Sequence, residues 1–88
     1  MRVKVLYRKN LKMSPGKLAA QVAHAVIGLG VTDTMATIVV LASSDSTFIR
    51  HSSGVGVYVH KDLGFTEVNA GEPTCLAFYE FNLSRKDE

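Results

Sequence analysis

The stretch that most constrains the fold is residues 12–29, which read KMSPGKLAAQVAHAVIGL. Most of it is apolar, at spacings that suit a helix of about 3.6 residues per turn. Ser14 followed by Pro15 is a typical helix entrance, with serine as the N-cap and proline at the first helical position. Gly28 and Gly30 supply stop signals. The sequence therefore predicts one helix that ends near position 29.

Two stripes run along this predicted helix. The first is apolar, is the natural face for packing on a sheet, and consists of Leu18, Val22, Ala25 and Leu29. The second is polar and joins Lys17, Gln21 and His24 at spacings of i, i+4 and i+7. A polar stripe is often no more than the solvated edge of an amphipathic helix. Here the residues around the stripe are small, and the far side of the helix is also apolar. The pattern is therefore equally consistent with a functional stripe that another backbone, another chain or a ligand approaches closely.

The rest of the chain predicts short strands and one further short helix. Strands are expected over residues 3–7, 36–42, 55–60 and 73–81, and helical turns within 43–53. The run ATIVVLA at 36–42 is continuously apolar, which is typical of a strand buried on both faces. The order β-α-β-α-β-β predicts an α/β fold, a mixed four-stranded sheet with helices packed on it, in a single compact domain over residues 1–88.

Composition restricts the class of protein. The chain has 88 residues, of which 47% are hydrophobic and 20% charged, as in one ordinary globular domain. Its single cysteine, Cys75, can form no internal disulfide and lies in an apolar run, so we expect a small core residue in a reducing compartment. We expect neither a signal peptide nor a membrane span, and hence a cytoplasmic protein. The core of so short a chain is small, and pairing into a homodimer is one remedy.

The basic residues are unevenly distributed. Six of the ten precede the first acidic residue, Asp33, namely Arg2, Lys4, Arg8, Lys9, Lys12 and Lys17. One end of the fold should therefore carry positive potential, which attracts nucleic-acid phosphate or a phosphorylated small molecule. A merely solvated basic surface explains the same distribution equally well.

A second informative stretch is the loop HKDLGFTEVNAGEPT at residues 60–74. It sets Asp62, Thr66, Glu67 and Thr74 around two glycines, between one predicted strand and the next. Loops at strand ends are where binding and catalytic sites are usually built. The same residue types also make ordinary turns, so this loop alone does not separate the two interpretations.

Two other kinds of site have little support. Gly16-Lys17 lacks the remaining glycine and the hydroxyl residue of a phosphate-binding loop. His24, His51 and His60 share no metal-ligand spacing, and in place of a metal site an ordinary surface or capping role explains them best.

Taken together, LKMSPGKLAAQVAHA and the distant VHKDLGFTEVNAGEPTCLAF resemble the peptidyl-tRNA hydrolases of the archaeal and eukaryotic type (type 2). The matching positions of the first segment are Leu11, Lys12, Met13, Gly16, Lys17, Ala19, Ala20, Gln21, His24 and Ala25. Those of the second segment are Asp62, Gly64, Thr66, Gly71 and Thr74. Asn10 departs from the family pattern, which usually has aspartate there, and the family's second helix before the second strand has no counterpart in GLGVTDTM.

The resemblance implies a hydrolase that cleaves the ester between a peptide and the ribose of a tRNA. It implies a mixed four-stranded sheet between helices, frequent dimers, and no metal or organic cofactor. The essential residues that it implies are Lys17, His24, Asp62 and Thr66. The alternative is a non-catalytic RNA- or protein-binding module on the same fold, which the missing helix favours.

A mechanism follows as a hypothesis. Lys17 would stabilise the oxyanion or bind the terminal phosphate, and Asp62 would orient Lys17 or act as the general base. Thr66 would supply a hydroxyl group. The residues expected to hold the substrate are Arg8, Lys9 and Lys12 on tRNA phosphates, Gln21, His24 and Thr74 near the tRNA end, and Tyr58 and Phe65 by stacking on a base or ribose.

Overall fold

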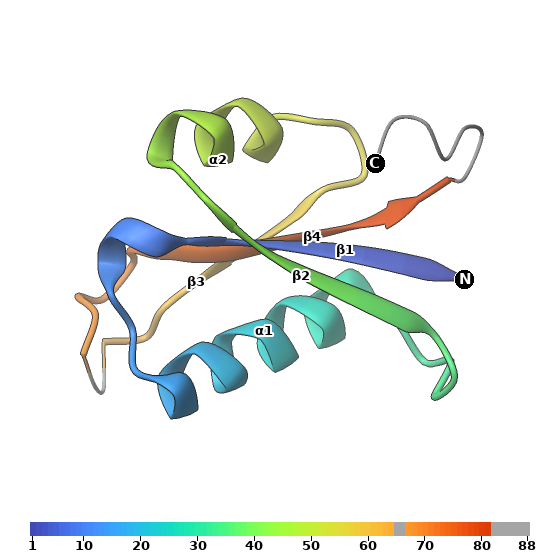
Figure 1. Ribbon diagram of the computed structural model, residues 1–88, viewed down its shortest axis with the longest axis horizontal. Coiled ribbons are helices and arrows are strands. Elements are labelled where there is room, and N and C mark those ends of the chain that lie inside the picture. Colours follow the sequence, from blue (N-terminus) through green and yellow to red (C-terminus); the bar gives the residue numbers. More distant parts are fainter. Residues whose placement is uncertain (65–66, 82–88) are drawn as a thin grey trace.

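The computed structural model describes residues 1–64 and 67–81, and its elements follow the predicted order (Figure 1). The strands are β1 (Arg2–Arg8), β2 (Thr37–Ser43), β3 (Tyr58–Lys61) and β4 (Pro73–Glu80), and the α-helices are α1 (Pro15–Leu29) and α2 (Asp45–Ser52). A 3₁₀ helix, η1 (Lys9–Leu11), lies between β1 and α1. The predicted site residue Thr66 and the predicted stacking residue Phe65 lie outside the described residues.

The four strands form one mixed sheet in the order β2-β1-β4-β3. β1 pairs in parallel with β2, while β4 pairs antiparallel with both β1 and β3. Val5, in the middle of β1, lies between Val40 and Ala77 on the two neighbouring strands. The predicted α/β class and mixed four-stranded sheet are confirmed.

The two helices cover opposite faces of this sheet (Figure 1). On the α1 side the core contains Val3, Val5, Ala25, Cys75 and Ala77. On the α2 side it contains Leu6, Phe48 and Leu76. Side chains alternate between the two faces along β1 and β4, as strand geometry requires. The predicted packing stripe of α1 lies on the first core, and Cys75 is a buried core residue as expected.

The start and end of α1 match the sequence prediction. The hydroxyl of Ser14 accepts a hydrogen bond from the Lys17 backbone N–H at 3.4 Å, and Pro15 is the first helical residue. Gly30 ends the helix with φ of 92°, in the left-handed region that glycine adopts without a steric penalty. This helix is therefore specified by local signals at both ends.

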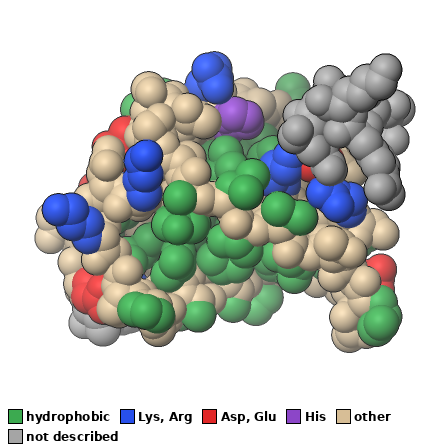
Figure 2. All heavy atoms as spheres, in the orientation of Figure 1, with side chains coloured by type: hydrophobic (Ala, Val, Ile, Leu, Met, Phe, Trp, Pro, Cys, Tyr) green, Lys and Arg blue, Asp and Glu red, His purple; other side chains and the backbone are tan. Residues whose placement is uncertain are grey.

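The prediction that residues 36–42 form a strand buried on both faces was wrong. β2 is an edge strand, and Ile38, Val40 and Leu41 are 45%, 41% and 41% exposed. An apolar groove runs between this strand and α1, and is lined by Pro15, Leu18, Ala19, Val22, Ala23, Val26, Ile27, Ile38 and Val40. Figure 2 shows hydrophobic side chains gathered across the middle of this face. The apolar run is real, but neither helix covers it.

The third strand is shorter and later than the predicted range of 55–60. Val55 is fully exposed, and Gly56 adopts φ of 76°, so the chain is still turning at these positions. Pairing with β4 begins only at Tyr58, opposite Ala77.

Within the described part of the chain, no helix has the length and apolarity needed to cross a membrane.

Candidate active site

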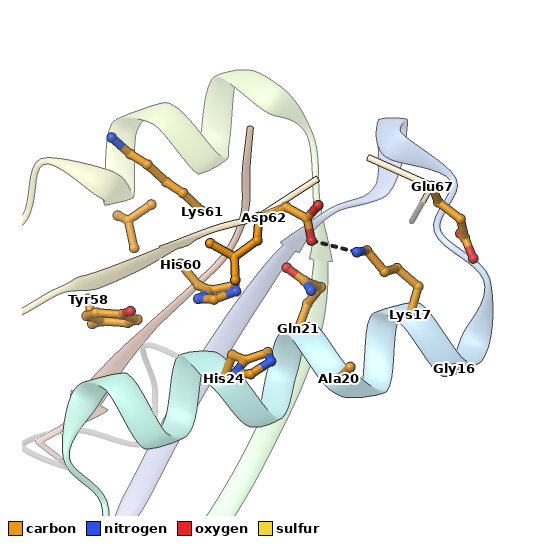
Figure 3. Close-up of a pocket in the computed structure, with 12 residues that line it drawn as sticks. Gly16, Lys17, Ala20, Gln21, His24, Tyr58, His60, Lys61, Asp62 and Glu67 are labelled. Carbon is orange, nitrogen blue, oxygen red and sulfur yellow. Dashed lines mark hydrogen bonds and ion pairs between the residues drawn. The ribbon is translucent and has the colours of Figure 1, made fainter. Parts of the chain in front are cut away.

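The polar stripe of α1 faces β3 and the loop that follows it across an open cavity (Figure 3). The cavity is lined by Gly16, Lys17, Ala20, Gln21 and His24 from α1, and by Tyr58, Val59, His60, Lys61, Asp62, Leu63 and Glu67 from the opposite side. The stripe is therefore not simply solvated. It forms one wall of a site whose other wall comes from a segment about 40 residues later in the chain.

An ion pair joins the two walls. Lys17 Nζ lies 2.5 Å from Asp62 Oδ1, and the two side chains are only 9% and 4% exposed (Figure 3). The second carboxylate oxygen of Asp62 accepts a hydrogen bond from the Gly64 backbone N–H at 2.7 Å. The Lys17 ammonium group, and then the Gly64 N–H, lower the pKa of Asp62, although burial opposes them. Asp62 is therefore an ionised carboxylate with both oxygens engaged.

Tight backbone packing holds the loop around Asp62. Gly64 adopts φ of 83°, and a Cβ there would lie 2.7 Å from the backbone nitrogen of Ala70. The Asp62 backbone donates to Glu72 O at 2.9 Å and accepts from the Gly71 N–H at 2.7 Å. These contacts fix the direction of the Asp62 side chain toward α1.

Glu67 attaches this loop to the start of α1. Its carboxylate accepts hydrogen bonds from the Ser14 backbone N–H, at 2.8 Å, and from the Ser14 hydroxyl. These two bonds lower the pKa of Glu67. The residue that caps the helix therefore also anchors the loop one turn away from Lys17.

Gln21 is held from beneath by Thr74. Thr74 is fully buried on β4, and its hydroxyl donates to Gln21 Oε1 at 2.6 Å. Gln21 is 4% exposed and lines the cavity between Lys17 and His24. The position of Thr74 favours an indirect role through Gln21 over the direct substrate contact expected from the sequence.

Rings line the end of the cavity away from Lys17. His24 and His60 stack with ring centroids 4.8 Å apart and an interplanar angle of 13°, and Tyr58 tilts against His60 at 6.5 Å (Figure 3). On α1, Gly28 leaves room for the Tyr58 ring, since a Cβ at position 28 would lie 2.2 Å from that ring. His60 was expected to be an ordinary surface or capping residue, and its place in the cavity was missed.

The family model described as peptidyl-tRNA hydrolase PTH2 matches residues 1–46, just over half of the 88 residues. The chain belongs to the peptidyl-tRNA hydrolase PTH2 family. No curated protein matches the chain.

The PTH2 match contains one wall of the cavity and not the other. Lys17, Gln21 and His24 lie within residues 1–46, while His60 and Asp62 lie beyond them. The structure therefore adds to the family match the fact that the later segment folds back onto the matched helix.

Three basic residues expected to contact tRNA lie outside the cavity of this PTH2 family member. Lys9 and Lys12 are exposed on and just after η1. Arg8 instead donates to Asp45 at 3.0 and 3.3 Å, to Pro73 O at 2.9 Å, and to the Glu72 carboxylate. These partners favour a structural role for Arg8, which ties the end of β1 to α2 and to the loop of Asp62.

Metal binding and attack by a thiol have little support among the described side chains of this site. Within residues 1–64 and 67–81, no group of three or more histidine, cysteine or acidic side chains is arranged to hold a metal ion. Burial raises the pKa of the Cys75 thiol to about 11, so it is protonated at neutral pH. The cavity groups best placed for chemistry are the Lys17–Asp62 pair, Gln21 and the two stacked histidines.

Proposed function

We propose that this protein hydrolyses the ester bond between a peptide and the 3′-terminal ribose of a tRNA. The observation that carries the proposal is the nearly buried Lys17–Asp62 ion pair at an open cavity, in a chain that belongs to the peptidyl-tRNA hydrolase PTH2 family. An ammonium group held in place at a cavity wall is suited to stabilise negative charge that develops on a substrate oxygen.

Lys17 is the electrophile in this mechanism. When water attacks the ester carbonyl, negative charge develops on the carbonyl oxygen, and a preorganised ammonium group stabilises it without reorganisation. Asp62 orients that ammonium group. Its lowered pKa and its two engaged oxygens make it a poor proton acceptor, so of the two roles expected for it, the orienting role is the better supported.

The remaining cavity residues position the end of the substrate. Gln21, fixed by Thr74, presents its amide group beside Lys17, and His24 borders the same space. We retain Thr66 as a hydroxyl donor on the sequence resemblance alone. Tyr58 offers a ring surface for a base or ribose at the far end.

Lys9 and Lys12 are proposed to contact tRNA phosphates. Both are exposed at the end of the molecule from which α1 begins, so a backbone that enters the cavity passes near them. Each phosphate contact releases counterions, which makes binding weaker as salt rises.

The test is release of an N-acetylated amino acid from N-acetylaminoacyl-tRNA, measured beside tRNA binding in the same buffer. We expect multiple turnovers by the unmodified protein and at least a hundredfold slower release by Lys17→Met, since removal of one preorganised donor costs about 10²–10³ in rate. Tight tRNA binding with no release would overturn the hydrolase and favour the binding module.

A cytoplasmic location and a homodimer stay predictions. For the homodimer, the apolar groove between α1 and β2 is the surface to test, because it contains exposed Ile38 and Val40. Sedimentation of the purified protein decides whether two copies pair.

A further inference from the structure

The proposed hydrolysis needs a group that takes a proton from the attacking water, and Asp62 is poorly suited to it. A good general base at neutral pH has a pKa near the working pH and a free lone pair within reach of the water. Asp62 accepts from Lys17 and from Gly64, one on each oxygen. The other candidate bases among the described residues of the cavity are imidazoles, which His24 and His60 supply.

We propose that His60 is the general base that activates the hydrolytic water, and that His24 is a positioning residue that holds the His60 ring by stacking. This inference rests on the proposed hydrolase function, and it names a residue that the family resemblance did not include among the site residues.

The geometry of His60 fits a base. It lies on β3, where it pairs with Cys75 of β4, so its backbone is held in the sheet. Its ring stacks on His24 at 4.8 Å and points into the cavity beside Gln21 (Figure 3). No hydrogen bond links a ring nitrogen of His60 to another residue within the described ranges 1–64 and 67–81. Its lone pair is therefore available to a water molecule.

The surroundings favour the neutral form of this imidazole. Burial, and then the neighbouring His24 and Lys17, lower the pKa of His60 below 6.5, while the carboxylate of Asp62 opposes them. The titratable and charged groups that face or flank His60 are Lys17 and His24 from α1, Tyr58, Lys61 and Asp62 along the opposite wall, Cys75 from β4, and Glu67 at the mouth of the cavity. Of these, Asp62 favours the protonated ring, and His24 and Lys17 disfavour it.

The step balances without another reactant. The unprotonated ring nitrogen of His60 takes one proton from water as the water oxygen bonds to the ester carbonyl carbon. Lys17 stabilises the oxyanion. When the bond from that carbon to the ribose oxygen breaks, the imidazolium returns its proton to the ribose oxygen. The products are a tRNA with a free ribose hydroxyl and a peptide with a carboxylic acid, which then ionises.

The experiment measures kcat/KM for release from N-acetylaminoacyl-tRNA against pH, in the unmodified protein and in His60→Ala, His24→Phe and His51→Gln. We expect the unmodified protein to lose activity as pH falls, with a midpoint below 6.5, because the base must be unprotonated. His60→Ala should lose about 10²–10⁴-fold at neutral pH. Free imidazole should restore part of the loss in this variant and should leave the unmodified protein unchanged.

His24→Phe keeps a ring for stacking and removes the imidazole whose charge lowers the pKa of His60, so the acid midpoint of this variant should move upward. His51 lies on α2 across the sheet, where its ring bonds to Thr47 O and stacks with Phe78, so His51→Gln should keep both rate and profile. Circular dichroism of each variant verifies the fold.

The outcomes separate this inference from the proposed function. Release by the unmodified protein with full activity in a folded His60→Ala variant overturns His60 as the base and leaves the hydrolase standing. Loss without rescue by imidazole, and with the acid midpoint unchanged, also overturns it. If His60→Ala does not fold, the pH profile of the unmodified protein is the test. A profile with no acid midpoint below pH 6.5 overturns His60 as the base. No release by the unmodified protein overturns both proposals.

Discussion

The two sides of α1 differ in how they are partnered. Along one side, each polar residue of the stripe meets a specific side chain: Lys17 meets Asp62, Gln21 meets Thr74, and His24 meets His60. Along the other side, the apolar residues border an open groove beside the edge strand β2. The same 15-residue helix thus contributes to a built site on one side and leaves apolar surface exposed on the other.

The polar residues of α1 take their partners from β3, β4 and the loop between these strands, whereas the apolar residues have the edge strand β2 as their neighbour. Contacts from residues 60–74 fix the polar side, and each is a pair that one substitution can break. The apolar side has no such pairs in the described part of the chain, so single changes there should have small effects on catalysis.

The largest effect is expected from the centre of the polar side. Lys17→Met keeps most of the side-chain volume and removes the ammonium group that faces Asp62, so release should slow by about 10²–10³-fold. The measurement is single-turnover release from N-acetylaminoacyl-tRNA. Lys9→Met, on the exposed 3₁₀ helix, is the matched control and should affect binding rather than the chemical step.

A second, smaller effect on release is expected from Thr74, which is buried behind Gln21. Thr74→Val removes the hydroxyl that donates to Gln21, leaving a buried carbonyl oxygen without its donor, which costs about 1–3 kcal/mol of unfolding free energy. Release should fall several-fold as Gln21 loses its orientation. Urea unfolding and the release assay measure the two effects. Thr47→Val, on α2 across the sheet, should leave the release rate unchanged. A stable Thr74→Val protein with full activity would contradict the role of Thr74.

The basic end should give a smaller, salt-dependent effect. The logarithm of the tRNA binding constant falls as the logarithm of the salt concentration rises. Lys12→Met should reduce the magnitude of this slope by about one for each lost phosphate contact. Arg8→Met should leave that slope unchanged and instead lower the thermal unfolding midpoint, because Arg8 is bonded to Asp45 and Glu72. Titration of uncharged tRNA at several salt concentrations distinguishes the two. A reduced slope for Arg8→Met would restore the original expectation that it contacts phosphate.

The smallest effect is expected on the apolar side. Ile38→Lys places a charge at a position that is already 45% exposed, so stability should change by about 0.5 kcal/mol or less and release by less than twofold. If two copies pair across the groove, sedimentation should show a dimer for the unmodified protein and a monomer for this variant. A dimer that survives Ile38→Lys would place the pairing elsewhere.

How well the sequence predicted each part depended on whether its signals were local. The bounds of α1 follow from Ser14, Pro15 and Gly30, which act within one turn of the helix ends, and they were predicted correctly. The sequence did not reveal that β2 lies at an edge, because an apolar run looks the same whether or not a helix covers it. That information lies in the strand order.

The candidate site was predictable only in part, because some of its sequence signals are local and others depend on contacts between distant segments. The stripe on α1 could be found from helical spacing, and the resemblance supplied Asp62 as its partner. His60 was missed because its importance depends on pairing with β4 and on the ring of His24, which are contacts between distant segments. One sequence signal was present: Tyr58, His60 and Asp62 alternate by two, which on a strand places side chains on one face.

The central claim is that Lys17 and Asp62 act together as one unit in hydrolysis. A double-mutant cycle on release, with Lys17→Met, Asp62→Asn and the two combined, tests it most directly. If Asp62 acts by orienting Lys17, the combined variant should be no slower than Lys17→Met alone. Losses that multiply, or a Lys17→Met protein as fast as the unmodified one, would contradict the claim.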